Sequence, residues 1–186
     1  DIINEYLTME GSYSDKAKLK QWLENVIKLP FGKYVGKDFE QLKDPEEIQG
    51  YIKDTQNLMD QAVHGHDEAK NNIVQMMVLY ITNPKSKGSC LGIWGPPGNG
   101  KTTLIKEGIA KAMGREFVFI SLGGAQDSEY LEGFSFTYEG STYGRIAQGL
   151  INCKCMNPII YFDELDKVSE GYKGMEIVNL LVHLID

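Results

Sequence analysis

Apolar residues in the first half of the chain recur with a spacing near 3.6, which is the period of an α-helix. This recurrence predicts helices over 14–29, about 45–63 and about 67–82. Pro30 ends the first helix, and Asp44 caps the second, because a proline at the first helical position and a glutamate at the third follow it. The inner face of the third helix is expected to carry Ala69, Ile73, Met76, Met77 and Tyr80.

Short apolar runs in the second half of the chain alternate with helical patterns. Strands are predicted over 90–94, 116–121 and 158–162. Helices are predicted over 102–113, 127–132 and 142–152, with a last one beginning near Gly174. Such alternation is typical of a parallel sheet whose strands are joined by right-handed helical crossovers. The sequence therefore predicts an α/β fold, in which helices flank a parallel sheet and a helical segment precedes it.

A glycine-rich loop, GPPGNGKT over 95–102, has the form G-x-x-x-x-G-K-[ST] of a phosphate-binding loop. Glycines allow positive φ and bring backbone N–H groups close to phosphate oxygens. Lys101 is expected to act in catalysis by contacting the β- and γ-phosphates of ATP, and the Thr102 hydroxyl to bind Mg²⁺. A chance glycine turn is the alternative, and the order of strand, loop and helix argues against it. The predicted nucleotide-binding residues of the loop are Gly95, Pro96, Pro97, Gly98, Asn99, Gly100, Lys101, Thr102 and Thr103.

An acidic pair, Asp163 and Glu164, follows the apolar run at 158–162. In open α/β sheets ligands bind at the carboxyl ends of the strands, where this pair is placed. Asp163 is expected to hold Mg²⁺, mostly through water, and Glu164 to orient and polarise the attacking water. An acidic pair after a strand is a weak signal by itself. Together with the glycine-rich loop it predicts the core of a P-loop nucleoside-triphosphatase, with ATP or ADP and Mg²⁺ as ligands.

Composition narrows the classes of function. The 186 residues carry a net charge of −7 and a sequence pI of about 5.0, so the chain offers no overall attraction to nucleic acid. No apolar run approaches the roughly 18 residues that a membrane span needs. The three cysteines, Cys90, Cys153 and Cys155, have no disulfide or zinc-site spacing, which favours reduced thiols inside a cell. We expect neither a membrane nor a nucleic-acid partner, and we expect the cytoplasm as the compartment, with the mitochondrial matrix as the alternative.

The stretch over 119–146 is more specific than the two ATPase motifs. It contains a serine-leucine-glycine-glycine turn, an aspartate, a threonine-tyrosine pair and a closing glycine-arginine-isoleucine. In this it resembles the AAA+ module of Lon proteases. The matching residues are Ser121, Leu122, Gly123, Gly124, Asp127, Thr137, Tyr138, Gly144, Arg145 and Ile146. The resemblance covers roughly residues 20–186 and includes both ATPase motifs.

The resemblance implies an ATP-driven unfoldase, hexameric in the full-length protein, that feeds unfolded or damaged proteins to a C-terminal serine protease domain. In the family the tyrosine of the threonine-tyrosine pair lines the axial pore, so Tyr138, followed by Glu139, is expected to grip the substrate. Val63, His64 and Gly65 fall where the family has its adenine-side segment, and they join the predicted nucleotide-binding residues.

Several positions depart from the family pattern. Residues 134–136 replace a His-Arg-Arg sequence and remove two cations, and Thr142 with Tyr143 replaces Met-Pro. Glu139 replaces an aliphatic residue, and His64 replaces the tyrosine of the adenine-side segment. The chain therefore resembles a divergent member of the family.

We expect the chain to be part of a longer protein, with a helical linker over 1–57 and an incomplete AAA+ nucleotide-binding subdomain over 58–186. Its only arginines, Arg115 and Arg145, do not match the arginine finger and sensor positions of the family, which are expected further along the chain. Two other functions stay open at this point, a non-proteolytic remodelling chaperone and a nucleic-acid-dependent P-loop ATPase. A serine–lysine pair downstream would identify the protease, and the acidic balance argues against the nucleic-acid enzyme.

Overall fold

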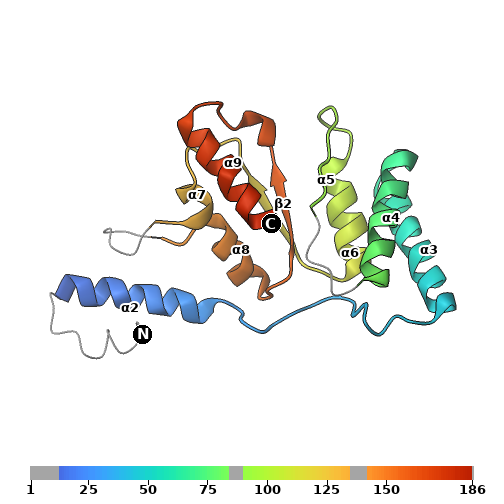
Figure 1. The fold of residues 1–186 in the computed structure, drawn as a ribbon, viewed down its shortest axis with the longest axis horizontal. Coiled ribbons are helices and arrows are strands. Elements are labelled where there is room, and N and C mark those ends of the chain that lie inside the picture. Colours follow the sequence, from blue (N-terminus) through green and yellow to red (C-terminus); the bar gives the residue numbers. More distant parts are fainter. Residues whose placement is uncertain (1–12, 84–89, 135–141, 186) are drawn as a thin grey trace. The chain divides into compact units, whose positions relative to one another are not determined.

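A computed structural model describes residues 13–83, 90–134 and 142–185 (Figure 1). These residues form two compact units, which are described in turn. Unit 1 takes in the stretches up to Tyr34 and from Val118 to Leu184, and unit 2 covers Val35–Phe117. The division into a linker and an ATPase subdomain at residue 57 stays a prediction.

Two helices of unit 2 begin and end at local sequence signals. Helix α3 covers Pro45–Ala62, and the Asp44 carboxylate caps it by accepting the Glu46 N–H at 3.3 Å. Helix α4 covers Asp67–Thr82 and ends at Asn83, directly before a proline. Both helices confirm the prediction from apolar spacing.

A third helical stretch of unit 2 follows the glycine-rich loop directly. It consists of α5 (Lys101–Thr103), the π-helix η1 (Leu104–Ala110) and α6 (Lys111–Met113). Gly114 ends it in the left-handed conformation, with φ of 62°, which is typical of a glycine at the C-terminal cap of a helix. Helix α3 packs against both this stretch and α4, so in the described part of unit 2 it is the helix that the other two share (Figure 1).

The buried face of α4 differs from the predicted one. The buried residues are Lys70, Ile73, Met77 and Ile81. Ala69, which was predicted on this face, is exposed, and Met76 and Tyr80 are half-buried. Hydrophobicity alone favours alanine over lysine for a buried position. That choice is wrong here, because the Lys70 ammonium has polar partners inside the unit, as described below.

The prediction of a first strand over 90–94 is wrong. In the part of the chain that the structure describes, the sheet contains only two strands, and this segment is not one of them. Leu91 is exposed, and Trp94 is 98% exposed. Apolar composition indicates that a segment can be buried in a sheet, but a strand also needs a neighbour that accepts and donates its backbone hydrogen bonds.

Unit 1 contains the two-stranded parallel sheet. Strand β1 covers Phe117–Ser121 and strand β2 covers Ile159–Asp163, each shifted by about one residue from its prediction. The Leu122 N–H donates to the Asp163 carbonyl at 2.9 Å and extends the pairing past the end of β1. A parallel sheet with helices around it confirms the predicted α/β class.

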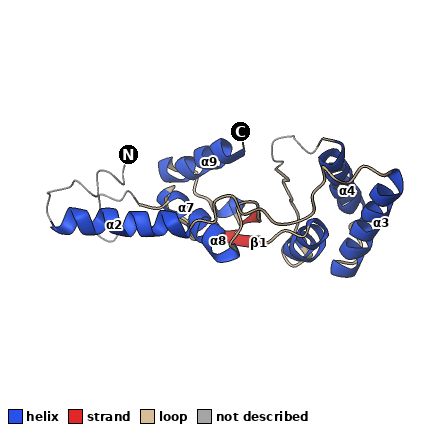
Figure 2. Ribbon diagram, turned by 90° about the horizontal axis from the view of Figure 1, so that it is seen from below, coloured by secondary structure: helices blue, strands red, loops and turns tan. Residues whose placement is uncertain are grey.

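The described helices of unit 1 are α2 (Tyr13–Lys28), α7 (Glu129–Glu132), α8 (Arg145–Cys153) and α9 (Tyr172–Ile185), with a 3₁₀ turn, η2, at Leu165–Lys167. Helices α8 and α9 lie close to the sheet, and α2 lies further from it (Figure 2). Buried residues at the centre of the unit are Ile120, Leu122, Leu131 and Ile177. Helix α8 approaches β1 closely, since a Cβ at Gly149 would lie 2.5 Å from Val118 Cγ1. Over the described residues, no helix combines the length and the apolarity of a membrane span.

Tyr51 is a buried polar side chain in unit 2. Its ring meets the Phe39 ring edge-on with centroids 5.6 Å apart, and the Lys37 ammonium lies 4.3 Å from its centre. Burial raises its pKa from the usual 10.0 to about 12. Among the described residues, the buried Tyr51 hydroxyl has no hydrogen-bond partner. An unsatisfied buried hydroxyl costs stability.

We therefore expect Tyr51→Phe to keep or raise the free energy of unfolding at pH 7, by up to about 1 kcal/mol. Between pH 10 and 12 the unfolded wild-type chain releases the phenolic proton while the folded chain keeps it, so wild-type stability falls relative to the variant. Urea denaturation at pH 7 and pH 11 measures both effects. Tyr34→Phe, at an exposed tyrosine, is the control. A loss above 1 kcal/mol at pH 7 in Tyr51→Phe alone would contradict the assignment.

Candidate nucleotide-binding site

The glycine-rich loop adopts a path that requires its glycines. Gly98 has φ of 75° and Gly100 has φ of 86°, in the left-handed region that other residues rarely adopt. A Cβ at Gly100 would also lie 3.0 Å from both Cγ atoms of Val63. A Cβ at Gly95 would lie 3.0 Å from Asn99 Nδ2. At Gly95 and Gly100 a close neighbour therefore leaves little room for a side chain.

Lys101 begins the helix that follows the loop, and its side chain folds back over the loop. Its ammonium donates to the carbonyl oxygens of Gly95 and Pro96, at 2.8 Å each. Phosphate oxygens could take the place of these carbonyls, and hydrogen bonds between an ammonium and phosphate are charge-assisted and strong. Within the described residues, the buried Asn99 Oδ1 has no hydrogen-bond partner. This cradle fits a phosphate chain, and the half-buried Thr102 beside Lys101 supplies a hydroxyl of the kind Mg²⁺ accepts.

The remaining predicted residues of the loop differ in exposure. Pro96, Pro97 and Thr103 are exposed, whereas Lys101 and Thr102 are half-buried. Lys101 and Thr102 are therefore less accessible to solvent than Pro96, Pro97 and Thr103.

The predicted adenine-side segment joins α3 to α4 next to the loop. Val63 is the C-cap of α3 and is half-buried, His64 is exposed, and Gly65 has φ of 74°. His66 is the N-cap of α4 and has a left-handed conformation. The close approach of Val63 to Gly100 therefore brings two sequence-predicted parts of the site together within unit 2.

The acidic pair stands at the carboxyl end of β2. Asp163 is the last residue of the strand and is half-buried. Glu164 follows with φ of 59° and ψ of 39°, a left-handed conformation that is uncommon for a residue other than glycine. Local strain of this kind is concentrated at functional sites. The turn after the strand therefore fits the functional role predicted for Glu164.

Ser121, the last residue of β1, holds the Glu164 carboxylate. Its hydroxyl donates to Glu164 Oε2 at 2.8 Å and accepts the Gly123 N–H at 3.4 Å. A Cβ at Gly123 would collide with the same carboxylate. Sequence reasoning named Ser121 only as part of the family resemblance. A polar residue at the end of the neighbouring predicted strand was the signal that could have identified it.

The glycine-rich loop belongs to unit 2 and the acidic pair to unit 1. Their meeting at one nucleotide therefore stays a prediction from the sequence.

Comparison with known proteins decides the family. Residues 91–186 match AAA, the ATPase family associated with various cellular activities. The chain belongs to this family. It is similar to a Lon protease homolog of Acanthamoeba polyphaga mimivirus, with 35% identity over 98% of this chain and 18% of that protein. It is also similar to Lon protease 1 of Bacillus subtilis, with 32% identity over 92% of this chain and 21% of the relative.

A Lon protease of Helicobacter pylori gives the same picture, with 36% identity over 93% of this chain and 21% of the relative. The chain is therefore an AAA+ module of Lon type, as the resemblance over 119–146 indicated. It spans about a fifth of the length of these relatives.

The two predicted pore residues of this AAA+ module, Tyr138 and Glu139, lie outside the described residues. The described backbone on either side of these two residues is joined by antiparallel hydrogen bonding. Gly133 and Tyr143 form an antiparallel bridge, and the next N–H inward, that of Phe134, donates to the Thr142 carbonyl at 3.0 Å. Phe134 and Thr142, the described residues nearest to the two predicted pore residues, are thus joined by a backbone hydrogen bond.

Stability measurements can test the conformation of Gly100 in the loop of this AAA+ module, with Gly50 in α3 as the matched control. We expect Gly100→Ala to lower the free energy of unfolding by about 1–2 kcal/mol, because alanine is strained at positive φ and its Cβ would press on Val63. Gly50 lies inside α3 with nothing near its missing Cβ, so Gly50→Ala should raise stability by about 0.5–1 kcal/mol. Denaturation of both variants measures this. Equal effects of the two alanines would contradict the loop conformation described here.

Proposed function

We propose that this AAA+ module binds ATP with Mg²⁺ and hydrolyses it to drive polypeptide unfolding and translocation into a protease domain of the same protein. The observation that carries the proposal is the position of the Lys101 ammonium, held over a glycine cradle by two carbonyl oxygens at 2.8 Å. The family match and the names of the Lon relatives support the choice of ATP and of protein substrates.

In this proposal, different residues bind the phosphates, hold Mg²⁺ and orient the attacking water. Lys101 and the loop N–H groups bind and orient the phosphates, and this positioning is the main part of phosphoryl-transfer catalysis. Mg²⁺, when bound by Thr102 and Asp163, supplies positive charge to the phosphate oxygens. Glu164 orients and polarises the attacking water. Because the Ser121 hydroxyl already bonds this carboxylate, it limits the directions from which water can approach Glu164.

The proposal for the whole protein goes further. We infer that the module assembles as a hexamer and that Tyr138 and Glu139 contact unfolded or damaged polypeptide in its pore. The backbone pairing of residues 133 and 143 supports this, since a substrate loop needs a fixed base. We propose the cytoplasm as the compartment, since the odd number of cysteines and their spacing favour reduced thiols. A serine–lysine pair in the remaining sequence would support the protease, and its absence there would favour a remodelling chaperone.

Lys101→Ala tests nucleotide binding. Removing a charge-assisted contact to phosphate should weaken ATP and ADP binding by about 2 kcal/mol, measured by titration calorimetry. Lys106→Ala, at an exposed lysine of the same helical stretch, is the control and should bind normally. Undiminished affinity in Lys101→Ala would refute the assignment of the loop.

Glu164→Gln tests hydrolysis. The amide keeps the shape of the side chain and can still accept the Ser121 hydrogen, but it lacks the negative charge that polarises water. In the longer protein the variant should bind ATP and fail to turn it over, as followed by phosphate release. Glu170→Gln, at an exposed glutamate of the same unit, is the control. Turnover by Glu164→Gln at the wild-type rate would exclude the proposed role.

A further inference from the structure

Lys70 is a buried lysine in unit 2. It belongs to α4, is only 6% exposed, and shares a face with Ile73 and Met77. Burying an ammonium costs free energy unless charged or polar partners replace its water. An apolar residue would complete this face without that cost. The partners of the Lys70 ammonium should therefore explain why a lysine occupies this buried position.

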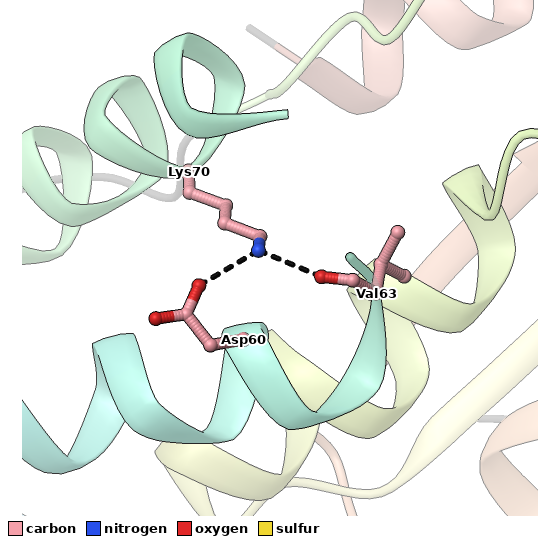
Figure 3. Close-up of polar contacts among 3 residues, drawn as sticks. All are labelled: Asp60, Val63 and Lys70. Carbon is pink, nitrogen blue, oxygen red and sulfur yellow. Dashed lines mark hydrogen bonds and ion pairs between the residues drawn. The ribbon is translucent and has the colours of Figure 1, made fainter. Parts of the chain in front are cut away.

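The partners of Lys70 are in the last turn of α3 and its cap (Figure 3). Its ammonium donates to Asp60 Oδ1 and to the Val63 carbonyl, at 2.7 Å each. The Asp60 carboxylate is 65% exposed, so it would have water in place of this partner. The Val63 carbonyl ends the helix, where a cation is favoured by the helix dipole. Lys70 therefore acts mainly on the position of Val63.

Val63 in turn lies close to the glycine-rich loop, at Gly100. Both of its Cγ atoms lie 3.0 Å from the place a Cβ would take on Gly100, the residue before Lys101. Its N–H donates to the Met59 carbonyl at 3.1 Å, and Met59 packs against Gly108 of the loop helix. Figure 3 shows the Val63 carbonyl facing Lys70 and its side chain on the side of the loop helix. Val63 is thus the link between the Lys70 ammonium and the loop.

We propose that Lys70 is a positioning residue for nucleotide binding. Its ammonium fixes Val63, and with it the adenine-side segment 63–65, at a set distance from Gly100 and Lys101. A nucleotide that contacts both the segment and the loop then binds to a preorganised site, which lowers the cost of ordering on binding. This inference rests on the proposed function, because it concerns the same site.

The test compares a ligand that uses both parts with one that uses the loop alone. Lys70→Met keeps the volume and removes the charge, and replacing a buried ion pair by an apolar side chain often preserves folding. We expect Lys70→Met to weaken Mg-ADP binding about tenfold. Mg-tripolyphosphate, which has no base, should change less than about twofold, because its phosphates meet only the loop. Titration calorimetry on the 186-residue chain measures both ligands.

Two further variants make the test specific. Val63→Ala removes the contact with Gly100 and should reproduce the selective loss of ADP, and the double variant with Lys70→Met should lose no more than either single one. This prediction stands even if Lys70→Met does not fold, as judged by circular dichroism. Lys53→Met, at an exposed lysine of α3, is the matched control and should bind both ligands normally.

The outcomes separate the two proposals. If wild type binds neither ligand, the proposed function fails. If wild type binds both, and folded Lys70→Met binds ADP normally or loses both ligands equally, the positioning role of Lys70 is overturned. Val63→Ala with unchanged ADP affinity would also overturn it.

Discussion

Unit 2 depends on the close approach of α3 to the helix that follows the phosphate loop. Gly108 leaves room for Met59, since a Cβ there would lie 2.9 Å from Met59 Cγ, and Gly100 leaves room for Val63 in the same way. Met59 is fully buried. Because an added methyl group at either glycine would push the helices apart, the loop stays in van der Waals contact with the segment that precedes α4. The predicted phosphate-binding residues and the predicted adenine-side residues are therefore coupled through packing.

A comparable constraint shapes the acidic end of unit 1. The parallel pairing of β1 and β2 brings the carboxyl ends of both strands to one edge of the sheet. Ser121 and Glu164 meet there, and Gly123 has no side chain because the carboxylate occupies that space. The left-handed backbone of Glu164 is tolerated since the strand, the hydroxyl and the following 3₁₀ turn all hold it. Both predicted halves of the site thus rely on a glycine beside a functional side chain.

Features that depend on residues near each other in the chain were predicted correctly, and features that depend on contacts between distant residues were not. Helices α3 and α4 were predicted well, because Asp44 and Asn83 act on backbone groups a few residues away. The strand over 90–94 was predicted wrongly, since its apolar residues say nothing about which strand would pair with them. On the inner face of α4, Ile73 and Met77 were predicted correctly. Lys70 was missed in favour of Ala69, because a scale of hydrophobicity cannot anticipate that Asp60 and Val63 would receive the Lys70 ammonium.

The sequence by itself determined the family of this protein and predicted the residues of its site. The loop over 95–102 and the pair Asp163–Glu164 are recognisable because their residues are neighbours in the chain, and their order encodes the local backbone. Only the tertiary structure decided what supports them. Lys70 reaches residues up to 10 positions earlier, and Ser121 reaches Glu164 across 43 positions. Such contacts depend on how helices and strands pack against each other, and no spacing along the chain specifies that packing.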